Sequence, residues 1–159
     1  MRKFGIIAVL SLMALALAAV PALAVNPHFT KASAAGPNAD GNLVVSFKIA
    51  GLGANETITV TTTGQASGQY ACINRGGNHP QASNKEDFAG PVSASGDFTS
   101  DKNGNVTGTL TLTPPPTTLD CPGNQKLVLA NVTYTGVSVS GGGDTATIPG
   151  TFTRTFVNV

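Results

Sequence analysis

Apolar and polar side chains alternate with a period of two residues along much of this chain. In one run, Val45, Phe47 and Ile49 are separated by single polar or small residues. Because successive side chains of a β-strand point to opposite faces, this period predicts strands with one buried and one wet face. The segments with the clearest alternation are 43–50, 57–62 and 106–113. No segment after residue 24 has the 3.6-residue period of an amphipathic helix.

Further candidate strands are rich in β-branched and aromatic residues but alternate less regularly. They are 28–31, 69–74, 91–99, 127–140 and 151–157. Turn signals separate the runs, with Asp40-Gly41, Asn103-Gly104 and the glycines before Asp144 all favouring hairpins. Seven or eight short strands without helices predict an all-β fold, an immunoglobulin-like β-sandwich. A small β-barrel is the alternative.

The candidate strand 127–140 changes phase along its length. Val132 and Tyr134 share one face, but the apolar positions then become Val137 and Val139. Gly136 stands at the change, which predicts a β-bulge or a bend there, and a strand that passes from one sheet to the other.

The first 24 residues have the order of a secretory signal peptide. Arg2 and Lys3 precede an uncharged, apolar run, and Pro21-Ala22-Leu23-Ala24 resembles a signal peptidase site. We expect cleavage after Ala24, with an uncleaved membrane anchor as the alternative. Residues 25–159 then form a single domain with no further segment long and apolar enough to span a membrane.

The charge of this domain excludes some partners. Of the nine Lys and Arg residues, two lie in the signal. The other seven, together with eight Asp and Glu residues, give residues 25–159 a net charge of about −1. Only 11% of the chain is charged. A nearly neutral domain offers no basic stripe for nucleic acid.

The chain has two cysteines, Cys72 and Cys121. In an exported protein an even number of cysteines predicts pairing. The alternative is a thiol pair for metal or redox chemistry, but CxxC spacing and further ligands are missing. We therefore predict a Cys72–Cys121 disulfide.

Several short blocks resemble a group of small secreted bacterial proteins of uncharacterised function. The blocks are Asn26–Phe29, Ser46–Lys48, Ala50–Gly53, Tyr70–Asn74, Gly76–Asn78, Pro80–Ala82, Gly90–Gly96, Cys121-Pro122, Gln125–Val132 and Pro149–Phe152. They span nearly all of residues 25–159. The resemblance implies a secreted β protein with these two cysteines, and it implies no activity or ligand.

The segment 74–87 breaks the strand pattern and concentrates hydrogen-bonding side chains directly after Cys72. Ordered loops on rigid sandwiches commonly carry binding sites. The candidate binding residues are Arg75, Asn78, His79, Gln81, Asn84 and Lys85. The alternative is a solvated connection whose side chains satisfy its own backbone.

No combination of residues predicts catalysis, a metal site or a cofactor. The only histidines are His28 and His79, and zinc needs three or four ligands brought together. Gly64–Gly68 lacks the nucleophile-elbow pattern of a serine hydrolase. The segment 101–105 resembles a calcium loop but lacks the required ligand series, so we predict a hairpin there.

Three side chains have predicted structural positions. Tyr70 and Tyr134 are expected at the edge of the core. Arg154 shares a face with Phe152 and Phe156, so either this face is partly open or the Arg154 guanidinium lies over an aromatic ring.

These observations favour a non-catalytic binding or structural domain that is secreted, extracellular or associated with the cell envelope. Its partner would be an unidentified protein or glycan. A secreted inhibitor or ligand-capture protein that uses the 74–87 loop is the alternative. A small hydrolase or a lectin is a third hypothesis, although the chain has no Trp for a sugar platform.

Overall fold

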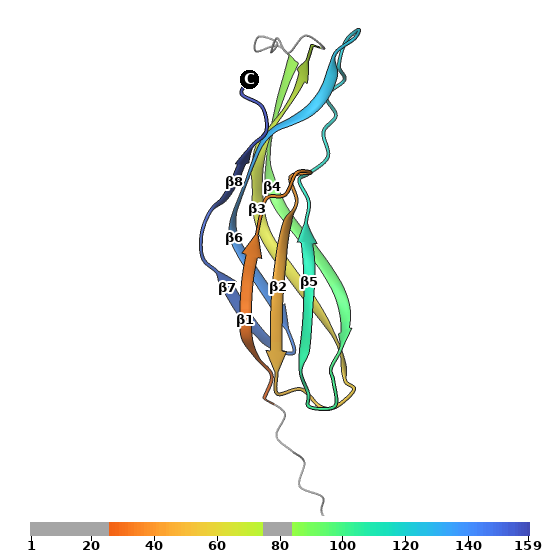
Figure 1. Cartoon of the computed structure of the whole chain (residues 1–159), viewed down its shortest axis with the longest axis vertical. Helices are drawn as coiled ribbons and strands as arrows, with labels where there is room; N and C mark the ends of the chain where they lie inside the picture. Colours follow the sequence, from red (N-terminus) through yellow and green to blue (C-terminus); the bar gives the residue numbers. More distant parts are fainter. Residues whose placement is uncertain (1–25, 75–83) are drawn as a thin grey trace, which may run out of the picture.

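The computed structural model describes residues 26–74 and 84–159. Eight β-strands form two antiparallel sheets in this part of the chain (Figure 1). The strands are β1 (His28–Ala35), β2 (Leu43–Ala50), β3 (Thr57–Ile73), β4 (Lys85–Thr99), β5 (Val106–Leu112), β6 (Lys126–Gly141), β7 (Asp144–Ile148) and β8 (Phe152–Thr155). One sheet has the order β1-β2-β5, and the other has the order β4-β3-β6-β7, with β8 also paired to β6. The predicted all-β sandwich is confirmed.

The strand order is the one expected of an immunoglobulin-like sandwich. Strands β1, β2 and β5 lie where such folds place A, B and E, and β3, β6 and β7 lie where they place C, F and G. Strand β4 extends the second sheet beside β3. Two separate sheets form, rather than the closed ladder that the alternative barrel would need.

The alternating residues build the core between the sheets. In β2 the side chains of Val45, Phe47 and Ile49 are buried, while Lys48 is exposed. Phe47 packs edge-on against Phe29 and Phe98, with ring centroids 6.4 and 5.0 Å apart. The two-residue period of the sequence therefore sets which face of each strand enters the core.

Strands β3 and β4 are much longer than predicted. The expected strands 57–62 and 69–74 are one continuous strand, β3, of 17 residues. Strand β4 begins at Lys85 rather than at Pro91. Pro91 is tolerated because β4 is an edge strand, where a missing N–H costs no ladder hydrogen bond. Gly64 and Gly68 do not interrupt β3, because β4 and β6 pair with it on both sides.

The predicted bulge at Gly136 is confirmed, but the predicted change of sheet is wrong. Gln65 pairs with Thr135 and Thr63 pairs with Ser138, so two residues of β6 stand opposite Gly64. Strand β6 remains beside β3 on both sides of the bulge. Its other neighbour changes instead, from β8 to β7.

The extra residue of β6 at the bulge keeps both halves of the strand facing the core. Val132 and Tyr134 before the bulge and Val137 and Val139 after it are all fully buried. One inserted residue lets both halves of β6 direct their apolar side chains into the same core.

The segment 101–105 is a turn but not the predicted hairpin. It joins β4 to β5, which belong to different sheets. The Asp101 carboxylate accepts hydrogen bonds from the backbone N–H groups of Asn103 and Asn105, at 2.8 and 2.9 Å. These bonds lower the pKa of Asp101 and stabilise the turn locally.

At one end of the molecule, β3, β4 and β6 extend beyond the three-stranded sheet (Figure 1). The connection between β5 and β6, residues 113–125, runs beside these projecting ends. We call the described residues of this region, 69–74, 84–89 and 113–130, the tip.

Candidate functional site

The tip includes two of the six predicted binding residues. Asn84 donates a hydrogen bond from Nδ2 to Oε1 of Gln125, at 3.1 Å. Lys85 is the first residue of β4 and stands opposite Ala71 of β3. Arg75, Asn78, His79 and Gln81 lie outside the described residues. The structure thus fixes both ends of the predicted loop, and Gln125 is a tip contact that the predicted site did not include.

The predicted disulfide is present at the tip. Cys72, near the end of β3, is bonded to Cys121 in the 113–125 connection, and their Cα atoms are 5.5 Å apart. The Cys72 side chain is buried, and Cys121 is half-buried. The bond therefore attaches the connection to the projecting end of the five-stranded sheet.

Further contacts hold the same connection in place. The Tyr70 hydroxyl donates to the carbonyl of Pro115 at 2.9 Å, and the Thr117 hydroxyl donates to the Glu86 carboxylate at 2.7 Å. The Tyr70 ring packs on Phe88, with centroids 5.3 Å apart. Burial and the nearby Glu86 charge raise the pKa of Tyr70. Tyr70 is half-buried, as expected of a residue at the core edge.

Tyr134 is more deeply buried than predicted. It is a central core residue with no exposed surface, and its burial raises its pKa to about 12. Of the two alternatives for Arg154, the structure has the guanidinium over a ring, 5.1 Å from the centroid of Phe156. Arg154 also donates to the Pro37 carbonyl at 3.1 Å, which joins β8 to the β1–β2 connection.

His28 lies at the start of β1, exposed, with Nδ1 3.0 Å from the carbonyl oxygen of Asn26. His79 lies outside the described residues. Across 26–74 and 84–159, no three His, Cys, Asp or Glu side chains come together as a metal site. The same two stretches contain no helix that is long and apolar enough to cross a membrane.

The outer face of the five-stranded sheet is covered by short polar side chains. Thr57 pairs with Thr99, Thr59 with Asp97, and Thr61 with Ser95 across the β3–β4 ladder. Each pair is joined by a side-chain hydrogen bond of 2.7–2.8 Å. This hydroxyl ladder, as we call these three bonded pairs, follows from the alternating threonines of the sequence.

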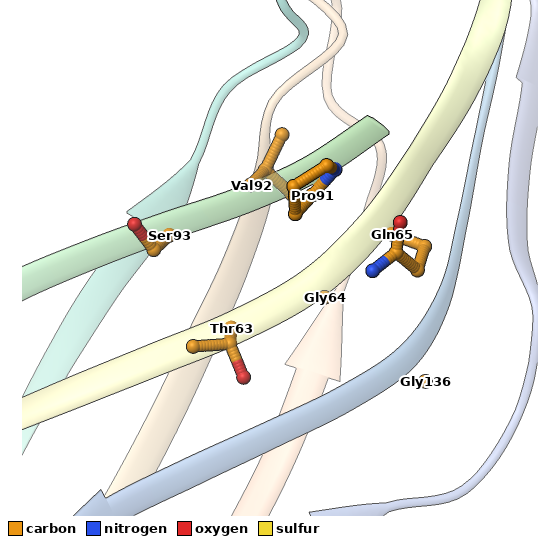
Figure 2. Close-up of a pocket in the computed structure, with 7 residues that line it drawn as sticks. All are labelled: Thr63, Gly64, Gln65, Pro91, Val92, Ser93 and Gly136. Carbon is orange, nitrogen blue, oxygen red and sulfur yellow. The ribbon is translucent and has the colours of Figure 1, made fainter. Parts of the chain in front are cut away.

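A shallow pocket interrupts this polar face at the bulge (Figure 2). Its volume is about 270 Å³. It is lined by Thr63, Gly64, Gln65, Pro91, Val92, Ser93 and Gly136. These residues come from β3, β4 and β6, and no prediction from the sequence brought them together. The predicted bulge at Gly136 was the one available signal.

A scan against protein-family models and searches of curated proteins and of solved structures gave no match to this chain.

Proposed function

We propose that this protein is an exported, non-catalytic binding domain that contacts its partner through the tip. The observation that carries the proposal is the way the tip is held. A disulfide at Cys72, the Tyr70–Pro115 hydrogen bond and the Thr117–Glu86 hydrogen bond all attach one connection to the projecting strands. These contacts lie at the projecting end, where the three-stranded sheet no longer covers the strands. They hold the connection in one conformation, which favours a surface that binds a partner.

Export is part of the same proposal. The signal-like residues 1–24 support it, and so does the resemblance to secreted bacterial proteins. A disulfide is the usual state of paired cysteines in an oxidising compartment and is rare in the cytosol. We therefore propose that the domain acts outside the cell or at the cell envelope.

The fixed ends of the 74–87 loop favour a second, narrower version of this function. Ala71 and Lys85 stand opposite each other, and Asn84 is bonded to Gln125. A loop held at both ends loses less conformational entropy on binding than a free one. An inhibitor or ligand-capture protein would use the loop in this way.

A pull-down from the native extracellular fluid tests the proposal. The tip variant replaces Asn84, Lys85 and Gln125 by alanine. The matched control variant replaces three exposed residues, His28 at the start of β1 and Lys102 and Asn103 in the β4–β5 connection. Both segments lie at the opposite end of the sandwich from the tip (Figure 1). We expect one partner to be captured by the wild type and the control, and to be lost with the tip variant. Equal capture by all three proteins would contradict a binding role for the tip.

A further inference from the structure

The hydroxyl ladder of the outer face stops at the pocket. Gln65 of β3 stands opposite Pro91, which has no polar side-chain group to offer. Ser93 stands opposite Thr63, but the Thr63 hydroxyl is bonded to Ser138 instead, at 3.0 Å. Within residues 26–74 and 84–159, the side chains of Gln65 and Ser93 have no hydrogen-bond partner. The polar groups of Gln65 and Ser93 are therefore available to a ligand, whereas the side chains of the neighbouring hydroxyl ladder are bonded to one another.

The bulge of β6 makes the room for that ligand. Gly136 has a φ of +59°, and a Cβ built on it would meet no atom within 4 Å. Pairing of β6 with β8 ends at Tyr134, and pairing with β7 begins at Val137, so neither strand pairs with Gly136. The hollow thus lies beside a backbone that carries no side chain. Figure 2 shows Gly136 on β6, across from Gln65 and Pro91.

The lining defines the chemistry of the ligand. None of the seven residues is ionisable, so a charged group would find no counter-charge there. Gln65 offers an amide donor and an acceptor, and Ser93 offers a hydroxyl. The Pro91 ring offers an apolar surface. A ligand with several hydroxyl groups and an apolar ring face matches this combination.

The volume limits the size of that ligand. Pockets for drug-sized molecules usually measure about 300–1,000 Å³. At about 270 Å³, this pocket accommodates one ring rather than a chain. We infer that the pocket at the Gly136 bulge is a binding site for a single neutral sugar ring. Such a site is separate from the tip and does not depend on the function proposed there.

Nuclear magnetic resonance titration of the folded domain tests this inference. The probes are the methyl glycosides of glucose, galactose, mannose and N-acetylglucosamine. With at least one probe, we expect saturable shifts at the backbone amides of Gly64, Gln65 and Gly136. The dissociation constant should lie in the millimolar range, as befits a shallow site with few contacts.

Two matched variants distinguish the pocket from other surfaces. Gly136→Asn adds a side chain to a residue that lines the pocket, and asparagine tolerates a positive φ better than most residues. Gly123→Asn makes the same change at a φ of +62°, with no atom within 4 Å of its Cβ, in the 113–125 connection. We expect at least a tenfold weaker affinity for Gly136→Asn, and an unchanged affinity for Gly123→Asn. Gln65→Ala should weaken binding several-fold.

Three results would overturn the inference. The first is no saturable shift at those amides with any of the four glycosides. The second is a set of shifts centred elsewhere on the domain. The third is equal affinity of the wild type and a folded Gly136→Asn variant. None of these results bears on the tip, whose partner is tested by the pull-down.

Discussion

The hydroxyl of Tyr134 donates a hydrogen bond to the backbone carbonyl of Gly41 at 2.8 Å, inside the core. Tyr134 belongs to β6, and Gly41 lies in the connection between β1 and β2. The same hydroxyl is 3.4 Å from the carbonyl of Leu112, the last residue of β5. Leu112 pairs with Leu43, the first residue of β2, so both carbonyls lie at the same end of the three-stranded sheet. One phenol group therefore joins the five-stranded sheet to that end.

Replacing Tyr134 by Phe is expected to destabilise the domain by about 1–3 kcal/mol, because the buried Gly41 carbonyl would lose its partner. Urea denaturation followed by circular dichroism measures the change. Tyr70→Phe is the control, since it removes a hydroxyl that bonds a half-buried carbonyl at the tip. If Tyr134→Phe lowered the free energy of unfolding no more than Tyr70→Phe does, the core hydrogen bond would contribute little to stability.

Alkaline pH should destabilise the domain through Tyr134. Burial raises the pKa of Tyr134 to about 12, from 10.0 in an exposed tyrosine. Between these values the unfolded chain loses the proton while the folded chain keeps it, so stability falls as the pH rises from 10 to 12. The full effect of such a shift is about 3 kcal/mol.

Denaturation curves at a series of alkaline pH values, for the wild type and for Tyr134→Phe, measure this contribution. The difference between the two proteins should shrink across that pH range. A constant difference would show that the hydroxyl titrates at its ordinary pKa. Tyr70, whose pKa is also raised, is present in both proteins and cancels.

Intact mass of the purified domain should be two hydrogens below the reduced value, because Cys72 and Cys121 are bonded. Replacing both cysteines by alanine should destabilise the domain by up to about 4 kcal/mol, since the bond closes a loop with a sequence separation of 49. We expect amide hydrogen exchange to accelerate most at the tip. Uniform acceleration along all strands would mean that the bond stabilises the whole sandwich instead of its projecting end.

Gly104 is expected to tolerate a side chain much less well than Gly90, which lies in β4 without a positive φ. Its φ is +73°, and a Cβ there would overlap the carbonyl oxygen of Leu52. Gly104→Ala should cost roughly 2–4 kcal/mol, from the strained φ together with a backbone shift. Gly90→Ala is the control, because a Cβ on Gly90 meets nothing within 4 Å. Thermal denaturation measures the melting temperatures of both variants. An equal fall for Gly104→Ala and Gly90→Ala would contradict the prediction.

The fold could be predicted from the sequence wherever burial follows the alternation of side chains. Leu43 to Ile49 in β2 and Val106 to Leu112 in β5 lie as expected, because a one-residue slip would expose the whole apolar set. The disulfide and the bulge were also predictable, from cysteine number and from the phase change at Gly136. Strand lengths were not. Whether Gly64 or Pro91 ends a strand depends on the neighbouring strands, which local sequence does not identify.

For the candidate sites, the sequence identified one segment and missed the other. Polar residues between Cys72 and Asp87 stand out as a break in the strand pattern, and the structure describes only Asn84 and Lys85 of the predicted set. The pocket at Gly136 combines residues about 30 to 70 positions apart in the chain. Gly136 was marked by the phase change, but the other lining residues are unremarkable within their own strands, so no local pattern could have brought them together.

The sequence by itself determined the two-layer β architecture, the faces of the strands and the pairing of Cys72 with Cys121, because these depend on side-chain period and on residue type. Only the tertiary structure decided that Tyr134 joins the two sheets, that the 113–125 connection is attached to the tip, and that Gln65 faces Pro91. Those relationships depend on strand register and on long-range pairing. Their energies arise only when distant segments meet.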